Sequence, residues 1–180
     1  RYAQASDGAK ALMANLKKPL IAMINGFCLG GGLAVAMSAD MRFAADDAQL
    51  GVPAGRLGIA YNFDALRRLV QLVGPAMANE IMFTARRLNA AEAQQAGLVN
   101  RVVPVDKLEE TVTEIAKTIS RNAPLSVNAS KVTIKEVLKD ESQRDLAKLA
   151  KISEDCFNSA DYQEGRQAFM EKREPVFIGR

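Results

Sequence analysis

The chain has 180 residues, 48% of them hydrophobic, which is enough to form a sizeable core in a single domain. Its 24 Lys and Arg residues nearly balance its 21 Asp and Glu residues, and no window approaches the roughly 18 consecutive apolar residues of a membrane helix, so we expect neither nucleic acid nor a membrane as a partner. The sequence has no histidine, which excludes Ser-His-Asp triads, Cys-His dyads and His-liganded zinc, and its two cysteines cannot build a structural zinc site.

The first half of the chain is predicted to be α/β. A short apolar run, Leu20 to Asn25, has the length and composition of a buried strand, and the proline before it closes a helix over residues 9–16. After a run of glycines, residues 33–39 are small and apolar on every side, which indicates a fully buried helix. Two further strands are predicted over residues 41–44 and 49–52. The chain opens at Arg1 without an initiator Met, on residues that favour a helix, so we expect an N-terminal part to precede it.

The second half is predicted to be mostly helical. Apolar residues repeat at helical spacing from Phe63 to Val73, and Gly74-Pro75 ends that helix and begins the next. Residues 98–103 form a short apolar run that is predicted to be a strand. Further helix starts are predicted from N-terminal signals, namely the capping-box pairs Asn89–Glu92, Asp106–Glu109 and Asp161–Glu164, together with Pro124 and Ser142.

A run of glycines carries the main chemical signal. The segment Asn25 to Asp40, NGFCLGGGLAVAMSAD, predicts a strand, a glycine turn and a buried helix. Without side chains, the turn lets the backbone approach a ligand closely, and free N–H groups at the helix start can stabilise an oxyanion. The spacing fits neither a P-loop nor a dinucleotide-binding glycine motif. The alternative is that the glycines only permit tight packing of the helix on the strand.

Three segments resemble the crotonase superfamily, also called the enoyl-CoA hydratase/isomerase family. They are KKPLIAMINGFCLGGGLAVAMSADMRFAADDAQLG, FTARRLNAAEAQQAGLVNRVVP and EGRQAFMEKREPVF, in the family's order. The resemblance implies an α/β fold: a crotonase-type ββα spiral core, here its C-terminal part (1–122), followed by a helical oligomerisation region (123–180). It also implies a homotrimer or hexamer and an acyl-CoA substrate whose thioester oxygen accepts two backbone N–H groups. No metal is implied, and no cofactor beyond the coenzyme A moiety of the substrate.

The resemblance assigns roles to individual residues. Gly31 would supply one of the two oxyanion amides, beside Gly30 in the substrate site, while the other amide belongs to a segment before Arg1. Phe169 and Lys172 stand at positions near the coenzyme A nucleotide. For Lys172 the alternative is a solvated helix face, and for Phe169 we favour ordinary core packing over contact with the ligand.

By the same resemblance, Ala34 and Ala54 stand at the positions of the two glutamates that the family's hydratases use. Adding water to an enoyl thioester requires groups that move protons, which a methyl group cannot do, so we expect ordinary hydration to be very slow. The segment LGIAYN, ending at Asn62, resembles the methylmalonyl-CoA decarboxylase branch, in which a tyrosine at the position of Tyr61 is functional. That branch keeps an acid at the position of Ala34, so the match is partial.

Within this stretch, Tyr61 is a catalytic candidate, while Ala34, Ala54, Arg56 and Asn62 are substrate-contact candidates. The alternative for Tyr61 is a half-buried structural phenol, and for Arg56 a surface or structural cation.

Several functions remain open at this point. One is decarboxylation of a malonyl-type thioester. The others are hydration or isomerisation by other residues, and binding of acyl-CoA without catalysis. RNA binding is disfavoured, because the basic residues of the second half interleave with acidic ones. Two cysteines are too few for a disulfide framework and indicate a reducing, cytoplasmic location.

Overall fold

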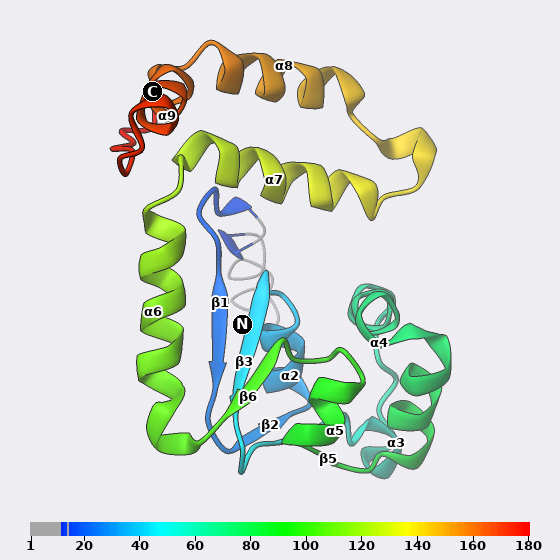
Figure 1. Cartoon of the computed structure of the whole chain (residues 1–180). Helices are drawn as coiled ribbons and strands as arrows, with labels where there is room; N and C mark the ends of the chain where they lie inside the picture. Colours follow the sequence, from blue (N-terminus) through cyan, green and yellow to red (C-terminus); the bar gives the residue numbers. More distant parts are fainter. Residues whose placement is uncertain (1–11, 14) are drawn as a thin grey trace. The chain divides into compact units, whose positions relative to one another are not determined.

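The computed structural model describes residues 12–13 and 15–180 of the chain (Figure 1). They divide into two compact units. The first unit holds Leu20–Thr113 with the described residues up to Leu16, and the second holds Lys17–Pro19 and Glu114–Arg180. This division falls earlier in the chain than the boundary expected at residue 122. Half of the helix predicted over residues 9–16 lies outside the described residues, and residues 12, 13 and 15, which are described, are helical.

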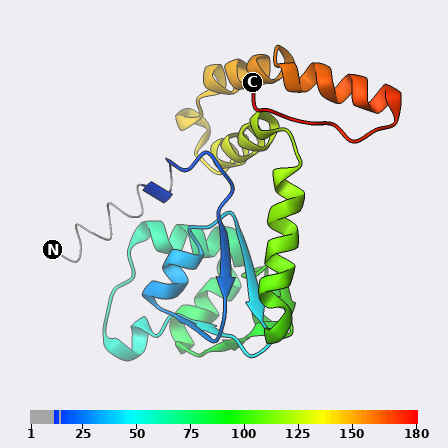
Figure 2. The same cartoon turned by 90° about the vertical axis from the view of Figure 1, so that its left-hand side faces the viewer.

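One parallel sheet of the first unit has the strand order β1-β3-β6. In this sheet Ile21 of β1 stands opposite Met41 of β3, and Phe43 of β3 stands opposite Arg101 of β6. The strands β1 and β3 run side by side in both views (Figures 1 and 2). The bounds of the strands are β1 (Ile21–Ile24), β3 (Met41–Ala45) and β6 (Arg101–Val103).

A second sheet has the order β2-β4-β5, with β2 and β4 parallel and β5 antiparallel to β4. Its strands are β2 (Phe27–Leu29), β4 (Gln49–Gly51) and β5 (Leu88–Asn89). The strand expected within Asn25 to Asp40 was given no bounds of its own, because β2 has three residues and lies between glycines. The backbone turns at both of its ends, where Gly26 and Gly30 have φ angles of 74° and 52° that favour glycine.

The helices of the first unit depart from prediction in two places. The helix expected over residues 33–39 begins two residues earlier, and it is not buried on every side, because Val35 is 51% exposed. The helix break predicted at Gly74-Pro75 is confirmed, because Gly74 inside α4 has a non-helical backbone conformation. The capping box of Asn89 with Glu92 is formed at the start of α5. The helices are α2 (Gly31–Ala36), α3 (Ala54–Leu57), α4 (Phe63–Thr84) and α5 (Ala90–Gln95).

The core of the first unit joins both sheets to these helices. Its members come from the strands β1 to β5, the helices α2 to α5 and the segment before β6, so the residues on both sides of the glycine turn between β2 and α2 are packed into the core. Burial of each such side chain contributes about 1.5–3 kcal/mol. The largest fully buried side chains are Leu33, Leu50, Leu69, Ile81, Leu88, Leu98 and Val52.

The division between the units falls inside α6, and the second unit continues in helices. The N-terminal signal at Pro124 is confirmed. The starts predicted at Ser142 and Asp161 are wrong: the caps are formed by Asp145 and Ser159, whose side chains accept N–H groups of Lys148 and Tyr162. The helices are α6 (Leu108–Ser120), α7 (Pro124–Val137), α8 (Leu146–Phe157) and α9 (Ala160–Glu171), with 3₁₀ turns η1 (Val105–Lys107) and η2 (Glu141–Gln143). Asp106 lies inside η1, so the helix start predicted there is also wrong.

The carboxylates predicted to begin α9 instead hold the C-terminal segment. The buried Asp161 accepts the N–H groups of Ile178 and Gly179 at 2.7 and 2.9 Å. Glu164 accepts a forked pair of bonds from Arg173, which lowers the pKa of this carboxyl to about 2, and it also accepts the N–H of Val176. If Asp161 and Glu164 instead capped their own helix, the N–H groups of Val176, Ile178 and Gly179 would lose these acceptors.

Gly51, at the end of β4, is a position where a larger residue does not fit. A Cβ there would lie 2.8 Å from the carbonyl oxygen of Arg86, a backbone atom. We therefore expect Gly51→Ala to lower the free energy of unfolding by about 1–3 kcal/mol, measured by chemical denaturation. The control is Gly55→Ala in α3, where the nearest atom lies at 3.6 Å and little or no loss is expected. Equal stability of the two variants would contradict this prediction.

Candidate active site at the glycine turn

Two parallel strands bring the predicted site residues to one edge of a sheet. Leu29 of β2 stands opposite Gly51 of β4, and the N–H of Gly30 donates to Gly51 O at 2.9 Å. The carboxyl ends of parallel strands meet at the same edge, so the starts of α2 and α3 lie near one another. Consistent with this, a Cβ at Gly30 would lie 3.9 Å from the ring of Pro53, the residue before α3.

Gly30 is held from both sides in a conformation that favours glycine, with φ 52° and ψ −114°. Its N–H is bonded to β4, as described above. Its carbonyl oxygen accepts two hydrogen bonds, from Ala34 N at 3.0 Å and from the hydroxyl of Tyr61 at 3.1 Å. These three bonds fix the orientation of the peptide that follows, the Gly30–Gly31 peptide.

The N–H of Gly31 belongs to this peptide and opens α2. The first N–H groups of a helix have no acceptor within it. Within the part of the chain that the structure describes, no acceptor is recorded for this N–H. Gly31 is exposed, and a Cβ built on it would have nothing within 4 Å. The group is therefore accessible to an oxygen atom of a ligand.

Ala34 and Ala54 both lie in the helices that start at this edge. Ala54 is the first residue of α3 and is 5% exposed, while Ala34 lies in α2 and is half-buried. Neither side chain can hold or transfer a proton. The structure thus places both positions beside the glycine turn, without carboxylates, and their equivalence to the glutamates that the resemblance implies stays a prediction.

Tyr61 lies in the loop between α3 and α4 and packs against the core. A carbonyl oxygen has no hydrogen to give, so in the contact with Gly30 O the phenol must be the donor, and a phenol has one hydrogen. Burial, with a smaller contribution from Cys28, raises the pKa of Tyr61, so the hydroxyl stays protonated at neutral pH. The predicted contact of this hydroxyl with a substrate stays a prediction. Here its hydrogen is directed to the glycine turn.

Arg56 and Asn62 flank Tyr61 in the chain. Arg56 is exposed on α3. Asn62 caps α4, with its Oδ1 accepting the N–H of Ala65 at 2.9 Å. The cap gives Asn62 a local structural role that the sequence analysis missed, although a polar residue directly before a predicted helix is the usual signal for one. Contact of either side chain with a substrate stays a prediction.

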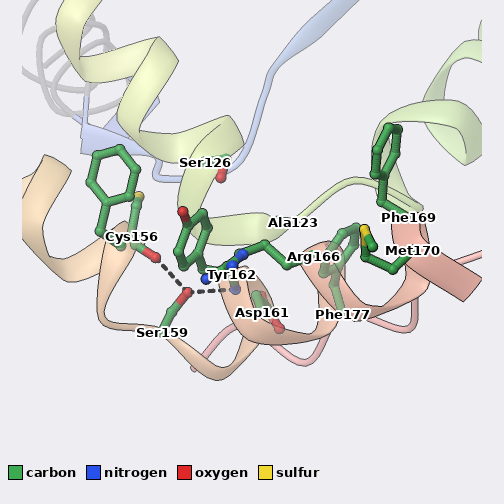
Figure 3. Close-up of a pocket in the computed structure, with 12 residues that line it drawn as sticks. Ala123, Ser126, Cys156, Ser159, Asp161, Tyr162, Arg166, Phe169, Met170 and Phe177 are labelled. Atoms are coloured by element: carbon green, nitrogen blue, oxygen red, sulfur yellow. Dashed lines mark hydrogen bonds between the residues drawn. The ribbon is translucent and has the colours of Figure 1, made fainter.

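Phe169 and Lys172 belong to the second unit, Phe169 on α9 and Lys172 directly after it. Phe169 is 83% exposed, so the expectation of core packing is wrong. Together with Met170 and Phe177 it lines an apolar pocket of about 570 Å³ (Figure 3). Lys172 is exposed and ends α9 with φ 55°, its N–H donating to Phe169 O. The predicted contact of both residues with coenzyme A stays a prediction.

Sequence reasoning also missed an exposed aromatic residue close to the turn. Phe27 of β2 is 70% exposed, and the guanidinium of Arg87 lies 5.1 Å from the centre of its ring. With Cys28 and Val35 it lines a small pocket of about 270 Å³. Phe27 is exposed while Cys28 beside it is buried, and the sequence Phe-Cys-Leu, which is apolar throughout, has no signal for this difference.

The described residues hold no group of three or more His, Cys, Asp or Glu side chains that could bind a metal ion. In the same part of the chain, no helix is long and apolar enough to cross a membrane.

Comparisons with known proteins identify the relatives of this chain. The sequence model of the family described as enoyl-CoA hydratase/isomerase matches residues 2–180. The short-chain-enoyl-CoA hydratase of Clostridium acetobutylicum is 42% identical over 158 residues, which is 88% of this chain and 60% of the relative. The crotonyl-CoA hydratase of Syntrophomonas wolfei is 41% identical over 169 residues, 94% of this chain and 65% of the relative. The crystal structure of an enoyl-CoA hydratase from Bacillus anthracis superimposes with a TM-score of 0.85 at 35% identity, covering 99% of this chain and 70% of that one. The chain thus spans less than two thirds of the length of these curated relatives.

Proposed function

The chain belongs to the enoyl-CoA hydratase/isomerase family, and we propose that the whole protein binds an acyl-CoA thioester whose carbonyl oxygen accepts the N–H of Gly31. The observation that carries the proposal is the accessible Gly31 N–H, for which no acceptor is recorded among the described residues, at the edge where α2 and α3 begin. This assigns the glycine turn to one half of an oxyanion site.

A hydrogen bond to the thioester oxygen stabilises an enolate more than it stabilises the neutral thioester, because negative charge moves onto that oxygen as the enolate forms. Preorganised backbone N–H groups act in this way without any reorganisation during the reaction. The three hydrogen bonds of Gly30 provide this preorganisation.

The reaction we favour is decarboxylation of a malonyl-type thioester. The bond between the α-carbon and the carboxylate breaks, its electron pair moves into the enolate, CO₂ leaves, and water or a weak acid protonates the α-carbon. No strong base is needed. A glutamate at Ala34 or Ala54 would instead repel the substrate carboxylate, by about 1–4 kcal/mol at 4 Å depending on the dielectric.

A second candidate is hydration or isomerisation of an enoyl thioester by residues other than glutamates. It is supported by the identities of 42% and 41% with relatives named as hydratases. A third is acyl-CoA binding without turnover, which is supported by the methyl groups at Ala34 and Ala54.

Under this proposal, the nucleotide of coenzyme A lies near Phe169 and Lys172, and the helices of the second unit assemble the protein into a trimer or hexamer in the cytoplasm. Exposed apolar side chains on those helices support an assembly: Ile134, Val137, Phe157, Phe169 and Met170. No metal and no further cofactor takes part in the reaction that we propose.

The three candidates separate in one set of assays on the whole protein. We expect CO₂ release from malonyl-CoA or methylmalonyl-CoA, and hydration of crotonyl-CoA that is slower by about 10² or more, because general acid–base groups are missing. Robust hydration with no CO₂ release would favour the second candidate. Binding of acyl-CoA by isothermal titration with no turnover of any substrate would favour the third, and no binding would contradict the proposed function.

A further inference from the structure

The hydrogen bond from Tyr61 to Gly30 O acts indirectly on the N–H of Gly31, the proposed oxyanion donor. The acceptor, Gly30 O, and the N–H of Gly31 belong to the same planar peptide group. A donor placed on the carbonyl oxygen therefore restrains the direction in which the N–H points. It also polarises the peptide, since hydrogen bonds in a chain strengthen one another, by about 10–30% per bond.

Tyr61 is placed for this role by its surroundings. Its ring packs against the core of the first unit, and the next residue, Asn62, caps α4. On its other side the chain leaves α3 through Gly58, whose φ of 64° favours glycine. The hydroxyl is thus held on the carbonyl side of the Gly30–Gly31 peptide, where its single hydrogen is donated to Gly30 O.

We propose that Tyr61 is a positioning residue: by donating to Gly30 O, it orients the Gly30–Gly31 peptide and strengthens the Gly31 N–H as a donor to the thioester oxygen. This inference rests on the proposed function. It replaces direct donation from Tyr61 to a substrate carboxylate, because one hydrogen cannot serve both acceptors. The role does not depend on the acyl group, so it holds for thioesters with and without a second carboxylate.

The test uses butyryl-CoA with ¹³C at the thioester carbonyl, a probe without a second carboxylate. Infrared difference spectroscopy of the probe bound to the whole protein reports how strongly its carbonyl is polarised. In the unmodified protein the stretch should move to lower frequency than in water. In Tyr61→Phe, which keeps the ring, this displacement should shrink while the Kd of the probe changes little. Ser120→Ala, in α6, removes a hydroxyl that likewise donates to a backbone carbonyl, that of Lys117 at 2.8 Å, and is the control, with the full displacement expected.

Kinetics give a second measurement on any thioester that the protein converts. An interaction felt mainly in the transition state lowers kcat with little effect on KM, so Tyr61→Phe should lower kcat by about three- to tenfold. A direct contact with a substrate carboxylate would instead raise KM for malonyl-type thioesters alone. That pattern would overturn the inference.

If Tyr61→Phe folds poorly, substitution of tyrosine by 3-fluorotyrosine keeps the hydroxyl and makes it a stronger donor. The carbonyl displacement should then grow, and an unchanged displacement would overturn the inference. An undiminished displacement in a folded Tyr61→Phe protein would also overturn it and leave the proposed function intact. A bound probe with no displacement in the unmodified protein would overturn the proposed function, and with it this inference.

Discussion

Replacing Gly31 by proline is expected to lower turnover of an acyl-CoA thioester by about 10²- to 10³-fold. Proline has no N–H, so it deletes the proposed donor directly. Gly31 is the first residue of α2, and the first helical position is where proline is best tolerated. We therefore expect the variant to fold, with most of its effect on the chemical step. Steady-state kinetics, with circular dichroism and thermal unfolding as folding checks, measure the loss.

Gly31→Ala is the matched control for this experiment. Alanine also adds a Cβ, for which the structure has open space, but it keeps the N–H. Turnover should therefore be much higher in Gly31→Ala than in Gly31→Pro. If both folded variants lost the same activity, the loss would come from crowding of the ligand and the amide would have no special role. Retained turnover in a folded Gly31→Pro protein would place the thioester oxygen elsewhere.

Local signals in the sequence predicted those parts of the fold that depend on neighbouring residues. The capping box of Asn89 and Glu92 and the helix break at Gly74 each depend on only a few consecutive residues, and both are present. The carboxylate of Asp161 has the same local signal, but it binds N–H groups 17 and 18 residues away. Such long-range partners compete with local capping, and a sequence pattern of four residues cannot show which wins.

The candidate site likewise has parts that a local sequence signal predicts and parts that depend on long-range contacts. The glycine turn is a local feature, and its backbone conformation at Gly30 agrees with the prediction. The pairing of β2 with β4, which brings Ala54 to this edge, depends on a strand too short to recognise from its composition. The bond between Tyr61 and Gly30 spans 31 residues. It arises from the packing of the loop before α4, which no periodicity in the sequence encodes.

Restoring both glutamates tests the interpretation of the site from the opposite direction. In the double variant Ala34→Glu with Ala54→Glu, we expect hydration of crotonyl-CoA to rise by about 10²- to 10⁴-fold over the unmodified protein, the range that general acid–base groups contribute. CO₂ release from malonyl-type thioesters should fall in the same variant, because two carboxylates near the α-carbon repel the carboxylate of the substrate. A spectrophotometric hydration assay and a CO₂ release assay measure the two activities.

The matched control is Ala34→Gln with Ala54→Gln, which has nearly the same volume but cannot take up or release protons near neutral pH. Position 54 is almost fully buried, so a glutamate there loses hydration, and both double variants should lose stability through crowding. The charge adds a further loss in the glutamate variant alone, since burial disfavours the ionised form. If both variants fold and hydrate crotonyl-CoA at equal rates, the carboxylates are not what the site lacks. If the unmodified protein already hydrates as fast as the glutamate variant, other residues have taken over the role of the glutamates. A gain confined to the glutamate variant, together with a loss of CO₂ release, would show that the methyl groups at Ala34 and Ala54 decide which reaction the glycine turn serves.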